Sequence, residues 1–182
     1  MNTREITDTY YAALEGQGEA IVADYVDDAL WTPRATVALV KAGLAACPSG
    51  KPAARGHAHQ NQWKRSEYLC LDVVIVDGDW SAPGFIAEHE NSPSRERIQY
   101  NAWKLLSVES RRRVLVAYWN GGKNGCATFE DLVKAVTEVT EAQPGKDILL
   151  IGGDYQAQPD SLAALRRAYR DSIVGTHRSL GK

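Results

Sequence analysis

The chain has 182 residues, a formal net charge of −2, and 44% hydrophobic against 24% charged residues. These values indicate one globular domain, residues 1–182, large enough to bury a core, and they exclude a strong global attraction to nucleic acid. No apolar run approaches the ~18 residues of a membrane span, and the start lacks a signal peptide, so we expect a cytoplasmic protein with no membrane partner. The cysteines lie far apart without a C-x-x-C pair, which predicts neither a disulfide framework nor a zinc site.

Residues 1–46 form the predicted helical N-terminal part of the domain. Apolar residues recur there at helical spacing, Gly16 and Gly18 interrupt the first helix, and Thr32 before Pro33 predicts the start of another. Residues 47–63 are predicted to form a loop because of their composition.

That loop contains two candidate features. His57 and His59 have no third ligand in spacing, so they predict no metal site. Basic residues around Trp63 indicate a solvated loop, with contact to a phosphate backbone as the alternative.

Two apolar runs, residues 68–76 and 85–90, are predicted to be neighbouring strands joined by a short connector. The first is apolar at almost every position, which is typical of a strand covered on both faces and makes a solitary Asp72 costly. In the second run, a period of two places Glu88 and Glu90 on one face and His89 on the other. If the strands are antiparallel, three carboxylates converge, and a divalent cation would relieve their repulsion.

These residues resemble the PD-(D/E)XK superfamily of restriction endonuclease-like nucleases. Leu71-Asp72 stands where the family has Pro-Asp, and Glu88-His89-Glu90 stands for its (D/E)-x-K. A predicted helix with Lys104-Leu105-Leu106 and a predicted strand 113–119 follow, so the similarity covers residues 64–119. It implies an α/β fold with a three-layer restriction endonuclease-like core, in which helices flank a mixed central sheet.

The resemblance also implies a function, a metal-dependent nuclease that hydrolyses phosphodiester bonds, in DNA rather than RNA. Mg²⁺ or Mn²⁺ would be held by Asp72, Glu88, Glu90 and the backbone carbonyl of His89. Double-strand cleavage with one site per subunit would favour a homodimer.

Glu90 replaces the lysine of the family pattern. In some family members the following helix supplies that lysine, which makes Lys104 a second candidate beside Glu90 for orienting the attacking water. The apolar stripe containing Ile98 and Leu105 lies well away from Lys104 on a helical wheel, so the wheel favours a solvated Lys104. The missing lysine also leaves an alternative function, a catalytically inactive module that binds nucleic acid or protein.

The rest of the core, to residue 152, alternates strands and helices. Ser92 before Pro93 predicts one helix start, and a capping box beginning at Thr128 predicts another. A buried strand is predicted at 148–151, ended by two glycines, and apolar spacing predicts a C-terminal helix over 159–174.

Two further segments have alternative readings. The basic triplet 111–113 indicates a solvated turn, with a phosphate-facing edge as the alternative. The glycine-rich segment 120–125 has the layout of a phosphate-binding loop but the wrong spacing, which favours a turn.

Overall fold

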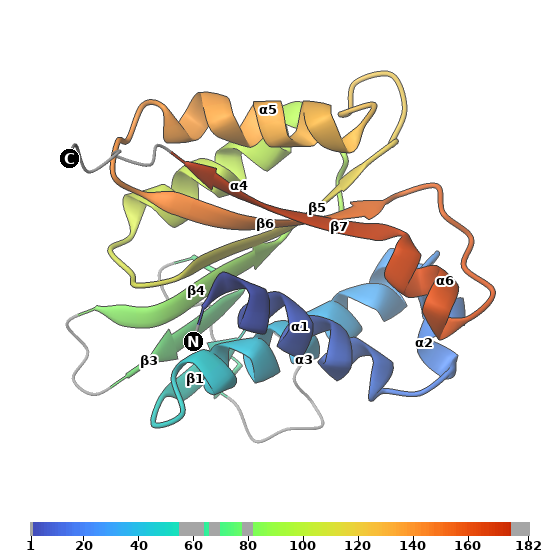
Figure 1. Ribbon diagram of the computed structural model, residues 1–182, viewed down its shortest axis with the longest axis horizontal. Coiled ribbons are helices and arrows are strands. Elements are labelled where there is room, and N and C mark those ends of the chain that lie inside the picture. Colours follow the sequence, from blue (N-terminus) through green and yellow to red (C-terminus); the bar gives the residue numbers. More distant parts are fainter. Residues whose placement is uncertain (1, 55–63, 66–69, 78–81, 176–182) are drawn as a thin grey trace.

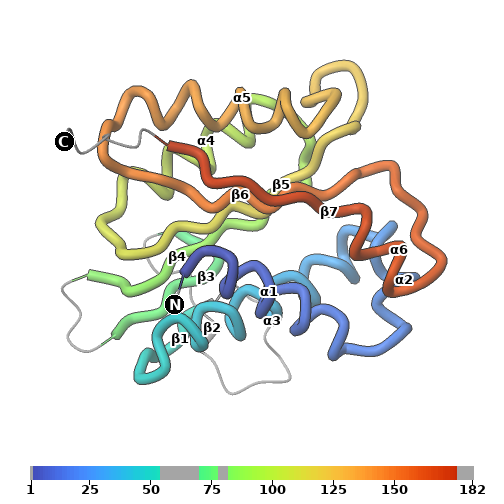
Figure 2. The backbone as a smooth tube through the Cα atoms, viewed as in Figure 1, coloured from blue at the N-terminus to red at the C-terminus, as the bar shows by residue number. Residues whose placement is uncertain are grey.

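The computed structural model describes residues 2–54, 64–65, 70–77 and 82–175 (Figures 1 and 2). Within them, strands form one open mixed sheet in the order β2-β1-β3-β4-β5-β6-β7. The strands are β1 (Lys51–Ala54), β2 (Lys64–Arg65), β3 (Val73–Val76), β4 (Pro83–His89), β5 (Arg113–Trp119), β6 (Asp147–Asp154) and β7 (Tyr169–Gly175). The helices are α1 (Thr3–Glu15), α2 (Ala20–Asp24), α3 (Asp28–Ala46), α4 (Arg95–Ser107), α5 (Phe129–Thr140) and α6 (Leu162–Arg167).

The direction of the strands follows from their connections. β3 pairs antiparallel with β1 on one side and with β4 on the other. Helices α4 and α5 return the chain to the same end of the sheet, so β4, β5 and β6 are parallel. β7 then pairs antiparallel with β6. The carboxyl ends of β4, β5 and β6 therefore share one edge of the sheet.

Helices cover both faces of this sheet, with α1 and α3 on one side and α4 and α5 on the other (Figure 1). Val73 and Ile75 of β3 belong to the core on the α1–α3 side, whereas Val74 and Val76 belong to the core on the α4–α5 side. This alternation explains the continuous apolar run, because both faces of the strand are buried. Gly43 allows α3 to lie close to the sheet, since an added Cβ would be 2.6 Å from Ile75 Cγ1.

Several predicted boundaries are confirmed by the structure. The strand at 113–119 and the capping box of Thr128 are as predicted, with α5 beginning at the next residue. Residues 1–46 are helical in their described part, and Gly18, at φ 84, follows the end of α1. These elements carry strong local signals, so their prediction needs no knowledge of tertiary contacts.

The predicted C-terminal helix over 159–174 is wrong beyond its first part. Helix α6 ends at Arg167, and β7 follows at once. Tyr169 and Ile173 fit a helical period of four, but they also fit the period of two of a strand. Pairing with β6 satisfies the polar backbone of that edge, and Tyr169 becomes buried.

Two other helix starts differ from the prediction. Asp27 caps α3 by accepting from the N–H groups of Ala29 and Leu30, so Pro33 lies inside the helix rather than at its start. Helix α4 begins after Ser94, not after Ser92.

Two strand predictions are also corrected. β6 runs through its two glycines to Asp154, and part of the predicted loop, residues 51–54, pairs with β3 as β1. The predicted features at 55–63 and 66–69 lie outside the described residues.

Candidate active site

Asp72 and Glu88, two of the carboxylates on which the family resemblance rests, lie where β3 begins and β4 ends. Val73 pairs with Ala87 in the antiparallel register, so Asp72 and Glu88 face each other one step further along. This confirms the prediction that the two strands are adjacent. The charge of Asp72 contributes to the raised pKa of Glu88.

A cavity of about 360 Å³ opens at this point between α3 and α4. The carboxyl end of a strand in an open α/β sheet is a common place for a ligand site. Its wall consists of Thr32, Thr36, Asp72, Glu88, His89, Glu90, Asn91, Arg97, Tyr100, Asn101 and Lys104.

Glu88 is the most deeply buried acid of the cavity. Its side chain is 3% exposed, and the Lys104 Nζ lies 2.9 Å from its Oε1. Burial, followed by the charge of Asp72, raises the pKa of Glu88 to about 8, although Lys104 and the Asp72 backbone N–H each lower it. A carboxyl group so placed exchanges its proton near neutral pH and gains from a second cation nearby.

Lys104 enters the cavity, so the expectation of a solvated lysine is wrong. Its side chain is only 18% exposed, and its Nζ also donates to the Cys70 carbonyl oxygen at 3.1 Å. The Cα atom of Lys104 lies well away from the apolar stripe of α4, but its long aliphatic stem carries the ammonium group around the helix to Glu88. A helical wheel gives only the direction of the Cα atom, so it does not account for the length of the lysine side chain.

The backbone and the side chain of His89 lie in different environments. Its N–H donates to Asp72 Oδ2 at 2.9 Å, at the carboxylate cluster. Its imidazole lies in the core on the other face, where Nε2 is 2.8 Å from Tyr118 Oη. Burial lowers the pKa of His89 to about 4 despite the opposing effect of Asp72, so the ring is neutral at pH 7.

Glu90 is held by hydrogen bonds from the segment that follows it. Its carboxylate accepts from Asn101 Nδ2 at 2.6 Å and from the Ser92 N–H at 2.8 Å. These bonds fix the connection between β4 and α4, and they direct both carboxylate oxygens to protein donors.

Sequence reasoning missed several residues of the cavity, Asn101 above all. Asn101 is 5% exposed, one helical turn before Lys104 on α4. A buried amide beside an apolar stripe is a detectable signal, because such a group needs a partner. The sequence predicts Thr32 only as a cap, but its hydroxyl accepts from Asn91 at the cavity wall.

The basic segments have other roles where the structure describes them. Arg113 is buried and donates to the carbonyl oxygens of Leu105, at 3.0 Å, and Val108, at 3.1 Å. Arg113 therefore holds the end of α4, whereas Arg111 and Arg112 are exposed, as the predicted solvated turn requires. In segment 120–125, Asn120 and Gly122 have positive φ angles, as in a turn. His57 and His59 lie outside the described residues.

Two carboxylates of the cavity are candidate ligands for a divalent cation. In the part of the chain that the structure describes, no group of three or more His, Cys, Asp or Glu side chains is placed to hold a metal ion. Mg²⁺, however, usually takes one or two carboxylates and keeps several waters. Asp72 and Glu88, two facing carboxylates on the wall of an open cavity, fit that requirement.

Comparisons with known proteins leave the site to be interpreted from its own geometry. Over the described residues, no helix has the length and apolar character needed to cross a membrane. No protein-family model, curated protein or solved structure matches this chain.

Proposed function

We propose that the protein is a metal-dependent nuclease with a restriction endonuclease-like core, acting on DNA in preference to RNA. The proposal rests on one observation above all: the ammonium group of Lys104 meets Glu88 at 2.9 Å, on the wall that Asp72 faces. Two carboxylates from adjacent strands and a lysine from the next helix form the set of groups that the family pattern requires.

The order of elements supports the same assignment. β3 follows Asp72, β4 leads to Glu88, and α4 then connects β4 to the parallel strand β5. A mixed sheet with helices on both faces agrees with the three-layer architecture that the resemblance implies.

Asp72 and Glu88 would hold Mg²⁺, with the backbone carbonyl of His89 as a further oxygen ligand. When bound, the ion would supply a more acidic water and would shield the charge that develops on the scissile phosphate. The His89 N–H orients Asp72 through their 2.9 Å hydrogen bond. Burial keeps Glu88 away from competing solvent, which favours a fixed ligand geometry.

Lys104 has the role of the family lysine in this proposal. The Cys70 carbonyl oxygen and Glu88 hold its ammonium group at the cavity wall. From there it can donate to a phosphate oxygen or to the attacking water, and charge-assisted hydrogen bonds of this kind are stronger than neutral ones. We assign Glu90 a positioning role, because its carboxylate binds Asn101 and Ser92.

The test is cleavage of plasmid and single-stranded DNA by purified protein with Mg²⁺, Mn²⁺ or EDTA. We expect cleavage only with a divalent ion, and none from Asp72→Ala. Asp160→Ala, which removes an exposed carboxylate elsewhere, is the matched control and should cleave normally. Wild-type protein that binds DNA but leaves it intact with both ions would indicate the inactive binding module instead.

A further inference from the structure

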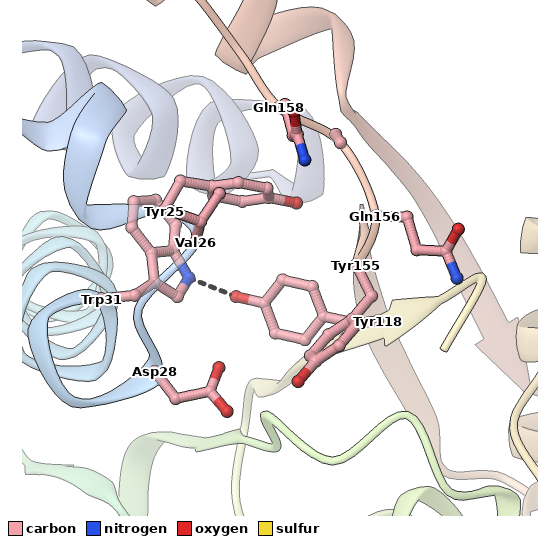
Figure 3. A pocket seen from close by; sticks show the side chains of 9 residues that line it. Tyr25, Val26, Asp28, Trp31, Tyr118, Tyr155, Gln156 and Gln158 are labelled. Atoms are coloured by element: carbon pink, nitrogen blue, oxygen red, sulfur yellow. Dashed lines mark hydrogen bonds between the residues drawn. The ribbon is translucent and has the colours of Figure 1, made fainter. Parts of the chain in front are cut away.

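A second cavity of about 360 Å³ lies beside the candidate active site, near the carboxyl ends of β5 and β6 (Figure 3). Four aromatic side chains form most of its wall. Tyr118 comes from β5, Tyr155 follows β6, Trp31 belongs to α3, and Tyr25 lies between α2 and α3. The volume is within the range of small-molecule sites, ~300 to 1,000 Å³.

The cavity has a buried aromatic floor and an exposed apolar rim. Tyr25, Trp31 and Tyr118 are each at most 6% exposed, whereas Tyr155 is 42% and Val26 67% exposed. The polar atoms of the floor have partners in the protein: Tyr25 Oη donates to the Asp154 carbonyl oxygen at 2.7 Å, and Trp31 Nε1 donates to Tyr118 Oη. The floor and rim therefore offer aromatic surface to a planar ring rather than hydrogen-bonding groups.

The hydrogen-bonding groups that remain lie at the edge of the cavity. The Asp28 carboxylate and the Gln158 amide point toward the space between the rings, while Gln156 points away (Figure 3). The described lining contains no lysine or arginine, so it offers no counter-charge to a phosphate. These features favour an uncharged aromatic ring that carries N–H donors at its edge.

We propose that this cavity, the base pocket, binds a guanine base, which stacks on Tyr155 and donates its N1–H and N2–H to the Asp28 carboxylate. Guanine carries these two donors side by side, and one carboxylate can accept both. Adenine, cytosine and thymine each place an acceptor beside their donor at the same edge, so they would repel one carboxylate oxygen.

The base pocket and the candidate active site share a wall. Trp31 lines the base pocket, and the next residue, Thr32, lines the active-site cavity. Tyr118 Oη lies 2.8 Å from Nε2 of His89, which directly follows Glu88. A single strand crossing the active site could therefore place an unpaired guanine in the base pocket. This last step rests on the proposed nuclease function, but the affinity for guanine does not.

The experiment is isothermal titration of the metal-free protein with guanosine, adenosine, cytidine and uridine. We expect guanosine to bind at least tenfold more tightly than the others, and Asp28→Asn to lose at least tenfold for guanosine alone. Glu141→Gln removes an exposed carboxylate at the end of α5 and should bind like wild type. Guanosine binding no tighter than adenosine binding, or unchanged in a folded Asp28→Asn, would overturn the proposal.

Two further measurements are needed. One tests whether the guanine belongs to a nucleic-acid strand, and the other tests whether the base pocket holds if the nuclease proposal fails. An oligothymidylate with one guanine should bind more tightly than guanosine and than oligothymidylate alone. Equal affinity for the oligonucleotide and for guanosine would exclude a nucleic-acid strand as the source of the bound guanine. Asp72→Ala should bind guanosine normally, because Asp72 does not line the base pocket. Wild-type protein that binds guanosine but cleaves no DNA with either ion would refute the nuclease and keep the base pocket.

Discussion

At the scale of single residues, Glu88 dominates the electrostatics of the candidate active site. Its carboxyl group is buried beside Asp72, and one lysine only partly offsets the cost of its charge. The raised pKa therefore records an unfavourable charge in the folded protein, which a bound cation would relieve.

The first prediction concerns the stability of Glu88→Gln. The pKa of Glu88 is about 8 in the folded protein against an ordinary 4.5, so between these pH values the folded state binds more protons than the unfolded state. Its contribution to the free energy of unfolding consequently falls as the pH rises through this window. We expect the melting temperature of Glu88→Gln to equal or exceed that of wild type at pH 9, with a smaller gain at pH 5.

Differential scanning calorimetry at the two pH values measures this, with Glu141→Gln as the control. Asp72→Asn should likewise leave stability unchanged or raise it, because it removes the charge that Glu88 meets. A melting temperature that falls by several degrees in both variants would identify a structural network around Lys104 instead.

The second prediction is that metal binding depends on pH. A cation must displace the proton from Glu88, whose pKa is raised to about 8 by burial and by Asp72. The dissociation constant for Mn²⁺ should therefore fall from pH 6 to pH 8 and become constant above that value. Titration followed by electron paramagnetic resonance tests this, and a constant affinity across the range would exclude Glu88 as a ligand.

At the scale of elements, the β4–α4 unit positions most of the candidate active site. β4 presents Glu88, the connection presents Glu90, and α4 returns Asn101 and Lys104 to the same wall. The distance between Lys104 and Glu88 is set by how α4 packs on the sheet, so a change in this packing would separate the two groups.

The third prediction compares Lys104→Ala with Glu90→Gln. The ion pair at 2.9 Å makes Lys104 the stronger candidate, so its removal should lower cleavage by about 10²-fold or more, almost as much as Asp72→Ala. Glu90→Gln keeps an oxygen that can accept from Asn101, and it should lose less than Lys104→Ala. Single-turnover cleavage measures both, with the exposed Lys134→Ala on α5 as the control. The reverse order of the two losses would make Glu90 the water-orienting group.

The fourth prediction concerns the end of α4. Arg113→Ala removes two hydrogen bonds to carbonyl oxygens of this helix end and leaves a buried gap. We expect a loss of about 2 to 4 kcal/mol in the free energy of unfolding, measured by urea denaturation. Arg167→Ala, at an exposed position of α6, should cost at most about 0.5 kcal/mol. Equal, small effects would show that the buried guanidinium contributes little.

Local signals explain how much of this was predictable from the sequence. The apolar runs around Asp72 and Glu88, and the capping box of Thr128, predict their elements from neighbouring residues alone, and the structure contains both strands and the helix. The strand bounds differ, because β3 covers only Val73–Val76 of its run and β4 begins at Pro83, within the predicted connector. The positions of Lys104 and Tyr169 depend on partners far away in the chain, Glu88 and strand β6. The spacing of the apolar residues in this segment fits a helix as well as a strand. The sequence alone therefore could not show that α6 ends and that β7 pairs with the edge of β6.

At the scale of the whole molecule, Tyr118 joins the two cavities and the layers around them. Its hydroxyl accepts from Trp31 Nε1 of α3 and lies 2.8 Å from His89 Nε2 of β4 and 3.2 Å from Tyr169 Oη of β7. All four side chains are buried, so this network connects three strands and a helix through polar atoms that water cannot satisfy.

The last prediction tests this network with Tyr118→Phe. The change removes one hydroxyl and leaves the Trp31 indole N–H buried without its partner, which should cost about 1 to 3 kcal/mol of the free energy of unfolding. Tyr155→Phe removes a hydroxyl from a side chain 42% exposed at the rim of the base pocket, and it should change stability by at most about 0.5 kcal/mol. Urea denaturation gives both values. If Tyr118→Phe is as stable as wild type, the network does not hold α3 against the sheet, and the shared wall of the two cavities is maintained by apolar packing alone.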